Sequence, residues 1–110
     1  MDGWRIEVLN ETVQAEIEAL PEDIRVRLTH ILDMMVEVGP ERMREPHVKH
    51  LRDKLWEMRM RGRDGIARAL YVTARGKRIV ILHAFVKKTQ ATPPRAIRLA
   101  LARAKELEVE

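Results

Sequence analysis

Positively charged side chains at regular spacing mark the segments where chemistry is most easily placed. Arg59 and Arg61 follow Glu57 at every second position, and Lys87 and Lys88 close a later hydrophobic run. Side chains two residues apart on a β-strand share a face, so Glu57 and the two arginines point to one side. Guanidinium and ammonium groups bind phosphate and stabilise negative charge that develops on it. The pattern therefore indicates a surface that holds a nucleic-acid backbone.

The later hydrophobic run adds a histidine and an aromatic ring to this surface. One parity of the run contains Ile79, Ile81, His83, Phe85 and Lys87, and the other contains Val80, Leu82, Ala84 and Val86. The second parity is wholly apolar, so we expect it to pack on helices and the first to remain open. His83 is an acid–base candidate because imidazole exchanges protons near neutral pH. Phe85 can stack on a base.

The strand between these two segments leaves its orientation open. Either Arg68 and Leu70 face outward, or Ala67, Ala69 and Tyr71 do. An arginine is costly to bury without a partner, which favours the first alternative.

The remaining polar candidates have simple structural interpretations. Glu57 could act as a base, but a carboxylate beside Arg59 and Arg61 more often pairs with them. His47 and His50 lie three residues apart without a third metal ligand nearby, so we interpret them as part of a solvated loop. Tyr71 is interpreted as structural.

Charge is unevenly distributed along the 110 residues, although the net charge is only +4. Residues 1–48 carry 5 Lys/Arg and 11 Asp/Glu, whereas residues 49–98 carry 14 Lys/Arg and 3 Asp/Glu. A segment with such a cationic excess repels itself, and a polyanion would relieve the repulsion. The length fits a single domain over residues 1–110. The chain has no cysteine, no apolar run long enough for a membrane span and no N-terminal signal pattern, so we expect a cytoplasmic protein.

Hydrophobic periodicity predicts the elements that position these residues. Strands are expected over 4–9, 55–61, 66–73 and 78–86, with 41–53 irregular. Asn10 is a predicted helix N-cap, Pro21 is predicted to open a second helix, and Gly39-Pro40 to end it. The second helix has an apolar stripe of Ile24, Leu28, Ile31, Leu32, Met35 and Val36. A last helix follows Pro93-Pro94, with a stripe of Ile97, Leu101 and Ala104.

This order predicts an α+β fold. An N-terminal strand and a two-helix hairpin pack on a three-stranded antiparallel β-meander, with the hairpin on one face of it, and a C-terminal helix follows. The other face of the sheet should then be open and basic.

Three stretches of the second half resemble HigB-type members of the RelE toxin superfamily. They are Lys54-Leu55-Trp56-Glu57-Met58-Arg59, Arg68-Ala69-Leu70-Tyr71, and the run from Ile79 to Pro93 with its His-x-Phe and Lys-Lys-Thr-Gln motifs. The first half agrees with this family only in the order of its strand and helices. The resemblance implies a RelE-like fold and a toxin of a type II toxin–antitoxin system.

The resemblance also implies an activity and partners. Such toxins are metal-free endoribonucleases without a cofactor that cut messenger RNA in the ribosomal A site, and an antitoxin neutralises them. The HigB-type antitoxin is HigA-like and carries a helix-turn-helix domain. No membrane partner is implied.

On the family's pattern, Arg59 and Arg68 match positions that clamp the phosphate. Lys87 and Lys88 match positions that bind RNA or assist proton transfer, with His83 as an acid–base candidate. Lys54, Arg61 and Phe85 are the expected RNA contacts. The chain departs from the founding members at Glu57, where they carry a lysine, and after Lys88, where it lacks their arginine and terminal tyrosine. These departures leave the general acid and base open.

Two other functions remain compatible with the sequence. ParE-type members of the superfamily poison DNA gyrase and are not nucleases, although Arg59, Arg68 and the Lys87-Lys88 pair argue against that assignment. A nucleic-acid-binding domain without activity would also explain the basic segment.

Overall fold

The N-terminal part of the chain forms one strand and two helices. The computed structural model describes residues 3–88 and 91–107. Its first elements are β1 (Arg5–Val8), α1 (Glu11–Glu18), α2 (Glu22–Val38) and the short 3₁₀ helix η1 (Pro40–Arg42). The Asn10 side chain caps α1 by accepting a hydrogen bond of 3.0 Å from the Val13 N–H, as expected. Pro21 is the N-cap of α2, so this helix begins one residue later than predicted.

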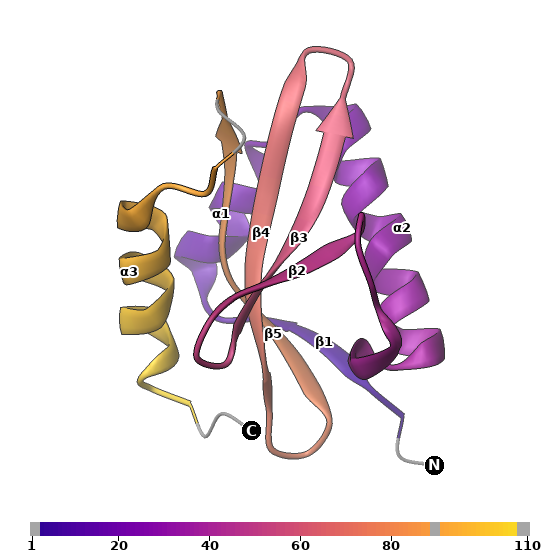
Figure 1. Ribbon diagram of the computed structural model, residues 1–110, viewed down its shortest axis with the longest axis vertical. Coiled ribbons are helices and arrows are strands. Elements are labelled where there is room, and N and C mark those ends of the chain that lie inside the picture. Colours follow the sequence, from indigo (N-terminus) through magenta and orange to yellow (C-terminus); the bar gives the residue numbers. More distant parts are fainter. Residues whose placement is uncertain (1–2, 89–90, 108–110) are drawn as a thin grey trace.

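The rest of the chain forms four strands and a helix. These are β2 (Val48–Arg52), β3 (Leu55–Gly62), β4 (Gly65–Ala74), β5 (Arg78–Lys87) and α3 (Pro94–Ala104). The sheet order is β1-β5-β4-β3-β2, in which β1 runs parallel to β5 and every other pair is antiparallel (Figure 1). The α+β prediction is thus confirmed. The prediction of an irregular segment over 41–53 was wrong in part, because β2 forms an edge strand there.

The helical hairpin packs on one face of the sheet. The buried residues of the hairpin are Val13, Leu20, Ile24, Leu28, Ile31 and Met35. They pack against Met58 and Met60 of β3, Ala69 and Tyr71 of β4, and Ile79 and Ile81 of β5. Val36, which the sequence placed in this stripe, is 40% exposed. Within the described ranges, no helix has the length and apolar character to cross a bilayer.

The opposite face of the sheet is covered in part by α3, which corrects the expectation of an open face. Ala96, Ala100 and Ala104 are buried on Leu70, Val72, Val80 and Leu82. Alanines at every fourth position form a flat strip that brings the helix close to the sheet. Ile97 and Leu101 of the predicted stripe pack only partly into this core. Figure 1 shows α3 and α2 on opposite sides of the strands.

A β-bulge in β5 changes which side chains share a face. The register pairs Leu70 with His83 and Tyr71 with Ile81, so Leu82 is the extra residue of β5. One inserted residue moves all following side chains to the other face. Ala84 therefore packs with the helical hairpin, whereas Val80 and Leu82 lie under α3. The predicted face of Val80, Leu82, Ala84 and Val86 was wrong for this reason, and Val86 is 51% exposed.

Candidate nucleic-acid interface

The strand register brings four charged residues to the α3 side of the sheet. Arg59 lies directly opposite Arg68, and Glu57 lies opposite Leu70 on the same two strands. Lys87 of β5 pairs with Ile66, two positions before Arg68. We call Glu57, Arg59, Arg68 and Lys87 the charged cluster. Arg68 and Leu70 thus share the α3 side, whereas Ala67, Ala69 and Tyr71 pack on the helical hairpin. The expectation that Arg68 and Leu70 face outward was wrong, because both are buried.

Glu57 is the carboxylate around which the cluster is arranged. Its Oε1 lies 3.5 Å from Arg68 Nε, and its Oε2 lies 3.6 Å from Arg59 Nε. The Thr92 hydroxyl, just before α3, also donates a hydrogen bond to Glu57. Glu57 and Arg68 are each 2% exposed and Lys87 is 5% exposed. A single buried carboxylate therefore faces three cations.

Burial, together with nearby positive charges, lowers the pKa of two cluster residues. Burial is the main cause for the lowered pKa of Lys87, and the nearby positive charges of Arg68, Arg59 and Lys49 lower it further. Burial also lowers the pKa of Arg68, again with contributions from Arg59 and Arg61. In both cases the charge of Glu57 acts in the opposite direction. The site is therefore short of negative charge, which a phosphate group would supply.

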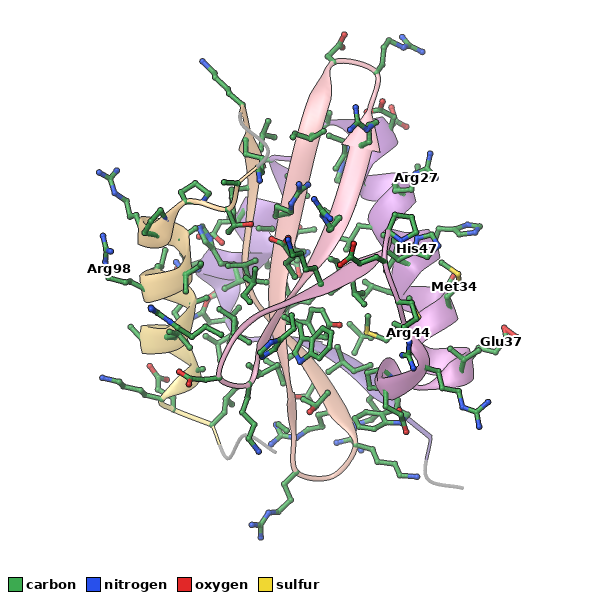
Figure 2. The ribbon with its side chains drawn as sticks, viewed as in Figure 1. Arg27, Met34, Glu37, Arg44, His47 and Arg98 are labelled. Carbon is green, nitrogen blue, oxygen red and sulfur yellow. The ribbon has the colours of Figure 1, made fainter. Side chains whose placement is uncertain are left out.

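A cleft of about 430 Å³ opens beside the cluster. Arg59, Arg61 and Arg68 line it together with Arg27 of α2 and with His47, which precedes β2. Figure 2 shows Arg27 and His47 on the same side of the molecule, where α2 passes the start of β2. The Arg59 N–H donates a hydrogen bond of 2.8 Å to the His47 carbonyl, which fixes His47 next to β3.

His47 and Arg27 were not found as site residues from the sequence. Their approach to Arg59 depends on the path of residues 39–47 between α2 and β2, which no local pattern encodes. Lys49 was also missed, because β2 was not predicted. In residues 3–88 and 91–107, no three His, Asp or Glu side chains lie close enough together to hold a metal ion, so His47 and His50 have no such partners there.

His83 is held at the edge of β5 by a residue that the sequence did not indicate. Its Nδ1 lies 2.8 Å from Glu16 Oε1 of α1, and its ring stacks on Phe85 with centroids 4.7 Å apart. Arg103 of α3 donates to both Glu16 oxygens, at 3.1 and 3.0 Å. Arg103 also donates to the Leu82 carbonyl at 2.7 Å. Glu16 therefore contacts both His83 of β5 and Arg103 of α3.

Glu16 and Arg103 complete the backbone hydrogen bonding of β5 beyond the end of β1. The last residue pair between β1 and β5 is Val8 with Ile81. Beyond this pair, the Ala84 N–H of β5 donates a hydrogen bond of 3.2 Å to Glu16 Oε1. Burial raises the pKa of Glu16, but the hydrogen bonds from Arg103, His83 and the Ala84 N–H outweigh it, so the pKa lies below its ordinary value. Glu16 is therefore charged at neutral pH.

The other predicted contacts are spread over the surface. Arg61 and Lys88 are exposed, at the cleft and at the end of β5 respectively. Lys54 lines a different pocket, together with Trp56 and Tyr71. Tyr71 is 2% exposed, and burial raises its pKa far above the ordinary value, in keeping with the structural role expected for it.

Comparison with known proteins identifies both the fold class and the family. The fold matches a solved structure described as the archaeal RelE–RelB complex from Pyrococcus horikoshii OT3, with a TM-score of 0.57 and 23% identity over 83% of this chain and 100% of that chain. The fold is therefore RelE-like. Residues 15–105 match the family described as "Phage derived protein Gp49-like (DUF891)", and the chain belongs to this family. No curated protein matches the chain significantly.

Proposed function

We propose that this protein is the toxin of a type II toxin–antitoxin system, of the HigB-like kind, and an endoribonuclease that cuts messenger RNA in the ribosomal A site. Residues 1–110 would act as one domain in the cytoplasm. The observation that carries the proposal is the charged cluster, in which Glu57 is outnumbered by three cations beside a cleft lined by arginines. The Gp49-like family and the RelE-like fold support it.

The proposed reaction is attack of a ribose 2′-hydroxyl on the adjacent phosphorus. The hydroxyl loses its proton, the new P–O bond forms a 2′,3′-cyclic phosphate, and the 5′-oxygen leaves with a proton. Negative charge grows on the phosphoryl oxygens meanwhile. Arg59 and Arg68 would bind these oxygens, and preorganised cations of this kind lower the barrier. Lys87 adds positive charge, and Lys88, Arg61 and Phe85 contact the RNA on either side.

Proton transfer needs a side chain that can act as a general acid or base. Among the side chains that line the cleft, His47 carries an imidazole, the group most often used in this role. Glu57 is engaged by Arg59, Arg68 and Thr92. His83 is engaged by Glu16 through Nδ1, which favours a role in positioning β5. We therefore assign proton transfer to His47.

The proposed partner is an antitoxin with a helix-turn-helix domain, as in HigA-like proteins. The solved relative was crystallised as a RelE–RelB complex, and an acidic segment would complement the basic face of this chain.

The test is inducible expression of the chain, alone and with its neighbouring gene, with RNA ends mapped across the transcriptome. We expect growth arrest and new 2′,3′-cyclic phosphate ends within translated frames, both relieved by the neighbour. Arg68→Ala should lose both effects. Arg59→Gln is a second variant with less structural risk, because the Arg59 side chain is 26% exposed. Arg98→Ala, on the outer side of α3 in Figure 2, is the matched control and should remain toxic.

Two results would contradict the proposal. Arrest with DNA damage and no new RNA ends would indicate a gyrase poison. Absence of arrest with soluble, folded protein would indicate a binding domain without activity.

A further inference from the structure

Three of the four Trp, Tyr and Phe residues of the chain line a single pocket of about 670 Å³. Trp4 lies just before β1, Trp56 lies on β3, and Tyr71 lies opposite Trp56 on β4. Tyr71 is 2% exposed and forms the floor, whereas Trp56 is 37% exposed at the rim. The pocket lies on the face of the sheet opposite the charged cluster. Nothing in the proposed cleavage reaction uses it.

Polar groups surround these aromatic walls. The His50 ring lies 5.1 Å from the Trp56 ring at an interplanar angle of 58°, and its Nε2 lies 2.7 Å from the Asp53 carbonyl. Lys54 and Thr73 also line the pocket, together with the acidic residues Glu41 and Asp53. A ligand with a flat aromatic face and hydrogen-bonding atoms at its edge would suit this lining.

We propose that this aromatic pocket binds an unpaired base of the RNA whose backbone occupies the arginine-lined cleft. The inference rests on the proposed function, and it adds a recognition site to it. Bases stack on aromatic side chains, and their edges accept and donate hydrogen bonds. The Lys54 ammonium and the Thr73 hydroxyl are suited to such an edge. An apolar side chain from a protein partner would offer a hydrogen bond to neither group, and the half-buried Thr73 hydroxyl would lose water without a replacement.

The two sites lie on opposite faces of the sheet but close together along β3. Trp56 precedes Arg59 by three residues on β3, which corresponds to roughly 10 Å along the strand. The route from one face to the other crosses the edge strand β2, where Lys49 and Arg52 are exposed. These cations can hold the phosphates between the two sites.

Tryptophan fluorescence reports directly on this pocket, because both tryptophans of the chain line it. The probe is a short single-stranded RNA with 2′-O-methyl groups, which cannot undergo 2′-hydroxyl attack, carrying a dye at one end. We expect the RNA to quench the tryptophan emission over the same concentration range in which the anisotropy of the dye rises. Replacing one base at a time by an abasic site should weaken binding about tenfold at one position.

Variants of the full chain test the same point from the protein side. Trp56→Leu should weaken binding about tenfold and remove the penalty of the abasic position, while Trp56→Phe should keep most of the affinity. Leu99→Ala is the matched control, because Leu99 is similarly exposed, at 38%, on α3. It should bind like the original chain. Circular dichroism verifies that each variant is folded.

The possible failures can be told apart. Binding by anisotropy without quenching, and without any sensitive base, would overturn the pocket while the proposed function stands. Absence of RNA binding altogether would overturn both. Quenching by the neighbouring gene's protein but not by RNA would assign the pocket to the antitoxin and overturn this inference.

Discussion

Arg59 and Arg68 lie directly opposite each other in the β3–β4 ladder, and one carboxylate, that of Glu57, contacts both. Like charges at directly opposed positions of an antiparallel pair destabilise it. The arrangement therefore depends on Glu57 in the free protein and gains from an added anion. Both consequences can be measured.

Glu57→Gln should destabilise the fold by about 3 kcal/mol, because the buried Arg68 and Lys87 would lose the negative charge of Glu57 that favours their charged forms. The midpoint of urea denaturation measures the change. Glu7→Gln is the matched control, since the Glu7 side chain is 36% exposed and pairs with Arg78 at 3.1 Å. A surface pair of this kind should cost less than about 1 kcal/mol. Equal effects of the two variants would show that Glu57 does not stabilise the cluster.

Inorganic phosphate should stabilise the free protein more than sodium chloride does at equal ionic strength. A site with a dissociation constant near 1 mM would add roughly 2.7 kcal/mol at a hundredfold excess of phosphate. Thermal unfolding in the two salts measures the difference. Arg59→Gln should reduce the difference, whereas Arg98→Ala, far from the cleft, should leave it in place. A melting temperature that depends only on ionic strength would argue against a phosphate site.

Acidification should remove the stabilisation that Glu16 provides. Its pKa in the folded protein lies below the ordinary value of 4.5, so the charged form stabilises the fold above that pH. The effect is lost as the pH falls through the folded pKa. Glu16→Gln should therefore be less stable by about 2 kcal/mol at neutral pH, and the gap should close in acid.

Urea denaturation at neutral pH and in acid measures this gap. Glu18→Gln, on the same helix, is the control, because Glu18 is exposed and accepts a hydrogen bond from Gln14 alone among the described contacts. A Glu16→Gln deficit that stays constant with pH would show that the carboxylate charge is not the cause.

Gly62→Ala should destabilise the β3–β4 hairpin. A Cβ atom at this position would lie 2.6 Å from Ile24 Cγ1 and 2.8 Å from Asp23 Oδ2. Asp23 also accepts a hydrogen bond of 2.6 Å from the Arg63 N–H, which attaches the hairpin tip to α2. Crowding of this kind costs about 1–3 kcal/mol. Gly65→Ala is the control, since its Cβ would meet only Val86 at 4.0 Å, and similar losses in both variants would contradict the steric explanation.

The element order could be predicted from local patterns, but the pairing of distant segments could not. Alternating residues identify β3, and the Asn10 cap identifies the start of α1, because both signals are local. In contrast, β2 has the polar residues Lys49, His50 and Arg52 among its five, so no alternation separates it from a loop. An edge strand tolerates such residues because one of its sides faces solvent.

The residue types of the site could be predicted from the sequence, but their positions relative to one another could be predicted only in part. The parity of β3 correctly placed Glu57 and Arg59 on one face. The bulge at Leu82 decided the face of His83, Phe85 and Lys87, and a single extra residue has no signature in a run that is apolar throughout. The contact of His83 with Glu16 spans 67 positions and that of Arg103 with Glu16 spans 87, so neither could be inferred from spacing.

The parallel pairing of β1 with β5 also constrains when the molecule can fold during its own synthesis. Residues 5–8 have β5 as their only strand neighbour in the sheet, so the first strand waits until residue 81 has been made. The charged cluster is completed later still, by Lys87, and the hydrogen bond from Thr92 to Glu57 is added after that. Contacts between distant segments form late in a chain that is built from its N-terminus. A nascent chain therefore cannot assemble the proposed phosphate-binding site before residue 92 has been added.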